Sequence, residues 1–158
     1  MASRRTRKGD VHFLRKILLC SSLLLIPLLV LAPFASAQVQ TRIRIIEASN
    51  VGTRVDPALK DIHGQLGSLF SFTSYHLLKD VRLTLVSNRP ERVPVHEGRY
   101  LEVTLVGEHR KMIELQLKII REGTAILNTQ VRLAPGGTVL VGGPKHREGV
   151  AILAVSAR

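Results

Sequence analysis

From residue 38 onward, the chain alternates between apolar and polar residues in runs that predict β-strands. The clearest run covers residues 113–119, where four apolar residues alternate with Glu114, Gln116 and Lys118. We expect Leu117, midway along this run, to lie in the core. The short connections between most runs favour antiparallel neighbours.

The remaining runs extend the same pattern along the domain. Nine runs, from which we expect about eight strands, cover residues 39–46, 72–78, 81–86, 93–95, 100–106, 113–119, 124–133, 138–141 and 150–155. Pro94 places its short strand at a sheet edge. Pro135 and Gly136 stand at the central positions expected of a type II turn. A loop over residues 142–149 is expected to join the last two strands.

One segment has helical rather than strand periodicity. Asp56 is suited to cap a helix whose first residue is Pro57. Apolar residues then follow at helical spacing: Leu59, Ile62, Leu66 and Leu69. We therefore expect one amphipathic helix over residues 57–69, weakened by two internal glycines. The fold class is α+β: a strand, a helix, and then an antiparallel β meander or a small sandwich.

The first expected strand has a basic side. Its apolar positions are expected to be buried, while Gln40, Arg42 and Arg44 alternate with them. We expect Arg42 and Arg44 to share a face that points to water. A second basic group, Lys145 with Arg147, lies in the expected last loop. These four residues are the candidate contacts for an anion or an anionic partner.

Residues 1–37 have the three parts of a secretory signal peptide. Six basic residues come first, an uncharged apolar run follows over residues 17–34, and Ala35, Ser36 and Ala37 form a cleavage pattern before Gln38. We expect cleavage there, leaving a single β-rich domain over residues 38–158. The alternative is an uncleaved membrane anchor, since the apolar run approaches the ~20 residues that span a bilayer. Either case predicts export to the periplasm or the extracellular space, and contact with the membrane only through an uncleaved leader.

Cysteine and charge narrow the possibilities further. Cys20 is the only cysteine and falls inside the leader, in a context that does not fit a lipoprotein site. The domain is therefore free of disulfides and of thiol chemistry. The formal net charge of the whole chain is +11. Removing the six basic residues and one acid of the leader leaves 17 basic and 11 acidic residues, a net charge of +6.

The familiar catalytic and cofactor motifs are missing from the sequence. Residues 137–142 have the glycine spacing of a phosphate loop, but Gly143 stands where the lysine is required. No G-x-S-x-G elbow occurs. The histidines of the domain have no chelating spacing and are interpreted as surface loop residues. We expect no catalytic residues, cofactor or metal, and no nucleic-acid partner, because basic and aromatic residues do not interleave.

Two segments carry a resemblance to known proteins. Residues 69–75 and 136–143 look like parts of small, uncharacterised exported bacterial proteins, and Gly136–Gly143 resembles the glycine-flanked strand near the end of secretin channel domains. The chain lacks the rest of a secretin. The resemblance implies a location in the cell envelope and no activity.

These observations favour a non-enzymatic envelope protein, a small module that binds or assembles with a protein partner or an anionic glycan or lipid. The rival hypothesis is a small periplasmic hydrolase whose site pairs Glu97 with His96 or His109. A flat surface with an open strand edge would favour the first hypothesis. A concave pocket with convergent histidine and carboxylate groups would favour the second.

Overall fold

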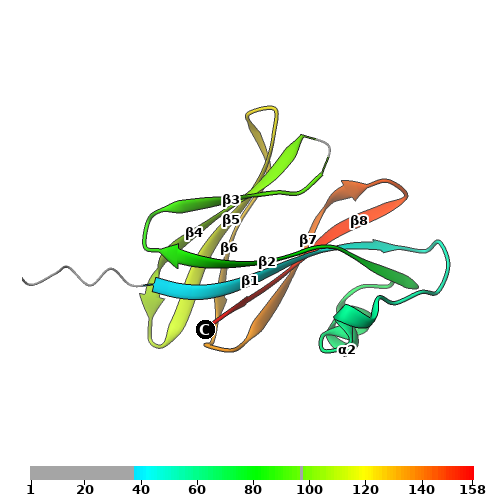
Figure 1. Ribbon diagram of the computed structural model, residues 1–158, viewed down its shortest axis with the longest axis horizontal. Coiled ribbons are helices and arrows are strands. Elements are labelled where there is room, and N and C mark those ends of the chain that lie inside the picture. The colour runs from blue at the N-terminus through cyan, green and yellow to red at the C-terminus, as the bar shows by residue number, and fades with distance from the viewer. Residues whose placement is uncertain (1–37, 97) are drawn as a thin grey trace, which may run out of the picture. The chain divides into compact units, whose positions relative to one another are not determined.

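A computed structural model describes residues 38–96 and 98–158 of the chain (Figure 1). The proposed leader, with Ala35 and Ala37 of its cleavage pattern, lies outside the described residues. The described part is mostly β, with eight strands in two antiparallel sheets and one α-helix. The predicted number of strands and the α+β class therefore fit the structure.

The first sheet, sheet A, brings together the two ends of the domain. It contains β1 (Gln38–Ser49), β2 (Ser74–Val86), β7 (Thr138–His146) and β8 (Gly149–Ala157). The strand order is β2-β1-β8-β7, and every neighbouring pair is antiparallel. The first and last strands of the domain are thus direct neighbours, as Figure 1 shows.

The second sheet, sheet B, is a simple meander of the four middle strands. It contains β3 (Pro90–Pro94), β4 (Arg99–His109), β5 (Met112–Arg121) and β6 (Thr124–Leu133) in the order of the sequence. The short strand with Pro94 lies at the edge, as predicted. An edge tolerates proline because one side of the strand needs no ladder hydrogen bond.

One apolar cluster is built from both sheets. Ile43 and Leu153 of sheet A and Leu101, Leu115 and Leu117 of sheet B belong to it, and all five are fully buried. A second cluster lies on the other face of sheet A, where residues 57–69 and the aromatic residues that follow them cover Ile46, Ile152 and their neighbours. The second cluster covers only part of that face.

The helical segment is less regular than the periodicity predicted. It consists of a 3-10 turn, η2 (Pro57–Leu59), and a short helix, α2 (His63–Leu69). Asp56 caps the start as predicted, since its side chain accepts a hydrogen bond from the Ala58 N–H at 3.0 Å. The prediction of one continuous helix was wrong, because the chain makes i to i+3 hydrogen bonds through residue 62. Leu69, expected on the apolar face, is 65% exposed.

Several strand boundaries also differ from the prediction, most of all in β2 and β7. Residues 74–86 form one long strand, β2, in place of two short ones. The expected loop over residues 142–149 is mostly strand, because β7 continues to His146 through an irregular register between Gly142 and Lys145. Only Arg147 and Glu148 remain as a two-residue turn before β8.

The clean alternation of β5 allows a direct test of the core. Leu117 is fully buried, as predicted, whereas Lys118 is half-buried on the opposite face. We expect Leu117→Ala to lower the free energy of unfolding by about 2–5 kcal/mol and Lys118→Ala to change it by about 0.5 kcal/mol or less. Urea melts measure both values. Equal losses of unfolding free energy in the two variants would show that the buried and exposed faces of β5 are assigned wrongly.

Candidate functional site

The two faces of β1 meet different environments. Val39, Thr41, Ile43 and Ile45 are buried toward sheet B, which confirms the predicted alternation. The other face of β1 starts polar and becomes apolar, ending at Ile46 and Ala48 beneath the helical segment. The polar half stays open and forms the floor of a hollow.

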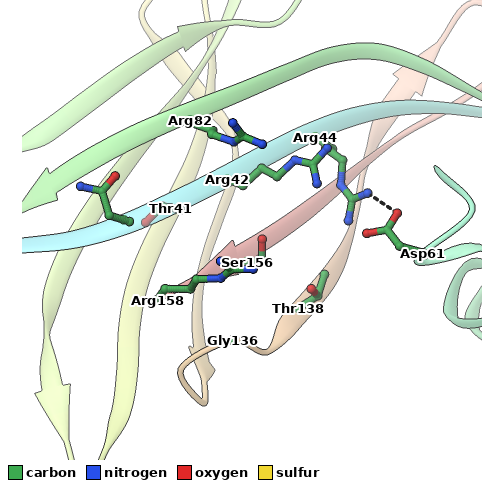
Figure 2. A pocket seen from close by; sticks show the side chains of 10 residues that line it. Thr41, Arg42, Arg44, Asp61, Arg82, Gly136, Thr138, Ser156 and Arg158 are labelled. Atoms are coloured by element: carbon green, nitrogen blue, oxygen red, sulfur yellow. Dashed lines mark hydrogen bonds and ion pairs between the residues drawn. The ribbon is translucent and has the colours of Figure 1, made fainter. Parts of the chain in front are cut away.

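This hollow has a volume of about 280 Å³. We call it the arginine hollow after its main side chains, which come from all four strands of sheet A and its C-terminal end: Arg42, Arg44, Arg82, Thr138, Ser156 and Arg158. Figure 2 shows Arg42 and Arg44 over β1, with Asp61 facing Arg44 from the helical segment. Four arginines against Asp61 and the nearby Asp80 leave side-chain charges of net +2.

Arg44 is the buried anchor of the hollow. Its side chain is only 3% exposed, and its Nη1 donates to Asp61 Oδ1 at 2.6 Å. The prediction that Arg44 points to water was therefore wrong. The alternation correctly places Arg44 on the face of β1 that points away from the core between the sheets. The helical segment, which contributes Asp61, packs next to Arg44 and covers its side chain. An arginine in this position is held by its ion pair rather than by solvent.

Arg42 is held by a second aspartate. Its Nε donates to Asp80 Oδ1 at 2.9 Å, and a second hydrogen bond reaches the other carboxylate oxygen. The two side chains remain about one-third exposed. This bidentate hydrogen bond raises the pKa of Arg42, and the same contact lowers the pKa of Asp80. Arg42 is thus fixed in orientation while one side of its guanidinium faces the hollow.

Two further arginines complete the positive lining. Arg82 lies directly across from Arg42 on β2, and Arg158 pairs with Gln40 through two backbone hydrogen bonds at the end of β8. Both are exposed. Within the described residues, neither guanidinium has a side-chain hydrogen bond or an ion pair. Their donors are available to a ligand.

Hydroxyl groups continue the row of arginines across the sheet. Arg42 is in register with Arg82 on one side and with Ser156 on the other, and Ser156 is in register with Thr138. Three strand spacings make this row roughly 14 Å long. Among the described residues, the two hydroxyl groups also make no hydrogen bond. This row therefore has cations at its β2 and β1 positions and neutral hydrogen-bonding groups at its β8 and β7 positions, with Arg158 beside Ser156 at the end of β8.

The second predicted basic group lies elsewhere. Lys145 pairs with Val150, whereas Arg42 pairs with Ser156, six residues further along β8. Six residues of strand span roughly 20 Å. Lys145 and Arg147 are both exposed, and Arg147 borders a separate hollow of about 400 Å³ with Glu47, His76 and Glu148. The structure thus does not bring the two predicted basic groups together.

The histidines are spread over the domain. His146 was expected in a surface loop but is 2% exposed in β7, with its Nε2 3.9 Å from Glu47 Oε1 and its ring 5.0 Å from the ring of His96. His96 and His109 lie near opposite ends of β4. Glu97, the proposed carboxylate partner, lies outside the described residues. No group of three metal-ligating side chains occurs within the part of the chain that is described.

Acid should remove part of the domain's stability through Asp61 and Asp80. Hydrogen bonds from Arg44 and Arg42 lower the pKa of these two carboxyl groups from its usual value. A carboxyl group whose pKa is lower in the folded than in the unfolded state stabilises the fold. Its full contribution is present above the unfolded pKa of about 4, and the contribution is lost as the pH falls through the folded pKa. Because the pairs are partly exposed, each contributes about 1 kcal/mol or less.

The matched variant is the double substitution Asp61→Asn with Asp80→Asn. Between pH 5 and pH 2.5, the urea midpoint of the native protein should fall further than that of the variant. If the urea midpoints of the two proteins fall by the same amount over this pH range, these ion pairs do not contribute to the stability of the fold.

Sequence reasoning missed most of the arginine hollow. It identified Arg42 and Arg44, but Arg82, Ser156 and Arg158 join them only through strand register. The alternation of Arg82 and Thr84 with apolar residues in the expected strand over residues 81–86 was the available signal. That signal assigns Arg82 to an outer face and leaves open which strand lies beside it.

Comparisons with known proteins give no relative for this chain. No family model matches it, and neither the curated proteins nor the solved structures yield a significant match. The resemblance of Gly136–Gly143 to a secretin strand stays a prediction. Among the described residues, no helix has the length and apolar character needed to cross a membrane.

Proposed function

We propose that this protein is a non-enzymatic binding module that holds an anionic ligand in the arginine hollow. The observation that carries the proposal is the pair of exposed arginines, Arg82 and Arg158, beside two arginines that aspartates already hold in place. Fixed guanidinium groups bind carboxylate, sulfate or phosphate oxygens through two parallel hydrogen bonds. The net positive charge of the domain attracts such ligands from a distance.

The proposal predicts binding that depends strongly on salt. A short dextran sulfate serves as the probe, titrated into the domain by calorimetry at 0.1 M and 1 M sodium chloride. Because the Debye length shortens from about 10 Å to about 3 Å over this range, affinity should fall sharply. Affinity that does not change with salt would point to an apolar or sheet-edge contact, and no binding at 0.1 M would refute the proposal.

We propose that the protein works outside the cytoplasm, in the periplasm or the extracellular space. The basic, apolar and small-residue parts of residues 1–37 support export, and an anionic envelope polymer or an envelope protein with an acidic surface is the corresponding partner. The exported protein should begin at Gln38, which intact mass spectrometry measures. A protein that still contains Ala35 and Ala37 and stays with the membranes after an alkaline carbonate wash would instead have an uncleaved anchor.

We also infer that the two sheets pack face to face as a small β-sandwich. The support is the apolar cluster to which inner-face residues of both sheets contribute. In this arrangement the arginine hollow lies on an outer face. A ligand could then bind without any opening of the core.

A hydrolase site other than the predicted pairing of Glu97 with His96 or His109 would use the hollow beside Arg147. There, His76 and Glu47 are in register on neighbouring strands, and Glu148 lies at the rim. His76 Nδ1 is 3.8 Å from Asp56 Oδ2, and its side chain is 65% exposed. This distance is longer than the hydrogen bond of about 2.6–3.2 Å that would orient a catalytic histidine, so the arginine hollow has the stronger support. A hydrolytic activity abolished by His76→Ala would reverse this choice.

A further inference from the structure

The mixed lining of the arginine hollow restricts the class of anion that fits it. This inference rests on the proposed function and concerns the same site. Arg82 and Arg42 occupy the β2 and β1 positions of the cross-strand row, and Ser156 and Thr138 occupy the β8 and β7 positions. A simple anion can use Ser156 and Thr138 only as hydrogen-bond donors. A ligand with hydroxyl groups next to its charge can use them both as donors and as acceptors.

Asp61 adds an acceptor to this lining. Its Oδ1 accepts from Arg44, and the side chain as a whole is 57% exposed at the border of the hollow. This carboxylate lowers the positive charge at its border of the hollow. It is also well suited to accept hydrogen bonds from the hydroxyl groups of a ligand.

The apolar surface argues against a lipid bilayer as the ligand. Binding to a membrane surface gains strength from apolar side chains that enter the headgroup region. The large apolar residues that are exposed in the described part of the chain are Val51, Leu69, Val106 and Ile126, and none of them lines the hollow. The surroundings of the arginines are polar.

We propose that the ligand is an acidic saccharide, a sugar chain in which carboxylate groups alternate with free hydroxyl groups. Arg82, Arg42 and Arg158 would bind the carboxylates. Ser156, Thr138 and Asp61 would exchange hydrogen bonds with ring hydroxyls. The row of roughly 14 Å is longer than a single carboxylate needs and accommodates an extended oligomer.

The test compares two tetravalent anions by calorimetry at one salt concentration. Tetragalacturonate carries four carboxylates with hydroxyl groups between them, and butane-1,2,3,4-tetracarboxylate carries four without hydroxyls. The native domain should bind the saccharide at least about tenfold more tightly, since each hydrogen bond from a hydroxyl group contributes a factor of about five. The double variant Ser156→Ala with Thr138→Val should remove most of this preference and leave only the part that Asp61 contributes.

A conservative variant separates hydrogen bonding from folding. Ser156→Thr with Thr138→Ser retains both hydroxyl groups and should retain the preference for the saccharide. Equal affinity of the native domain for the two anions would overturn this inference and leave the proposed function standing. If neither anion binds, both this inference and the proposed function are overturned. Tighter binding to phosphatidylglycerol vesicles than to tetragalacturonate would assign the hollow to a lipid surface instead.

Discussion

Arg44→Glu is expected to destabilise the domain by about 3 kcal/mol or more. The side chain of Arg44 is 3% exposed, so the variant buries a carboxylate in its place. That carboxylate would face Asp61, which now accepts from Arg44, and Asp80, which is in register with it on β2. An unpaired buried charge costs several kcal/mol, a large share of the 5–15 kcal/mol by which domains are typically stable.

The matched control is Arg82→Glu, which makes the same change of charge on the same face. Arg82 is exposed and makes no side-chain hydrogen bond or ion pair in the described part of the chain, although its charge helps to lower the pKa of Asp80. Its substitution should therefore change the free energy of unfolding by about 1 kcal/mol or less. Urea melts of the two variants give the comparison. If both unfold at the same urea concentration, Arg44 is solvated and the described packing of the helical segment is wrong.

Arg82→Glu with Arg158→Glu is expected to weaken the binding of dextran sulfate by at least about thirtyfold. Two attractive contacts become two repulsive ones, and each change contributes about 1 kcal/mol near a solvated surface. Because neither guanidinium supports the fold through a side-chain contact among the described residues, the double variant should remain folded. Calorimetry at 0.1 M salt measures the affinity, and circular dichroism checks the fold.

The control double variant is Lys145→Glu with Arg147→Glu. It changes the net charge of the domain by the same amount at exposed positions, with Lys145 roughly 20 Å along β8 from the position of Arg42. At 0.1 M salt that distance exceeds the Debye length, so affinity should fall by about threefold or less. Equal losses in the two double variants would mean that binding follows net charge rather than a site.

The strands of sheet B and the turns next to them could be predicted from the sequence because β4 and β5 alternate apolar and polar residues over most of their length and the turns are short. Leu117 is buried as the alternation of its strand requires, and the type II turn at Pro135 is present, with Gly136 at a φ of 80° and the Gly137 N–H bonded to the Ala134 carbonyl at 2.8 Å. These features depend on residues close together in the sequence.

The arginine hollow could not be predicted in the same way, because it depends on contacts between distant segments. Alternation distinguishes the two faces of β1, but it does not tell which face a later helix will cover, and so it misassigned Arg44. Alternation also does not give the order of the strands in the sheet. That order places Arg82 and Ser156 on either side of Arg42. The length of β7 was underestimated because glycines and a proline interrupt its apolar pattern.

The central claim is that an anionic ligand binds on the outer face of sheet A, at the arginine hollow. The most direct measurement is a titration of the ¹⁵N-labelled domain with a short dextran sulfate, followed by amide chemical shifts. The account predicts that the largest shift changes belong to residues of the hollow and their neighbours, among them Gln40, Arg42, Arg82 and Ser156. Shift changes concentrated around Lys145 and Arg147, or spread over sheet B, would contradict it.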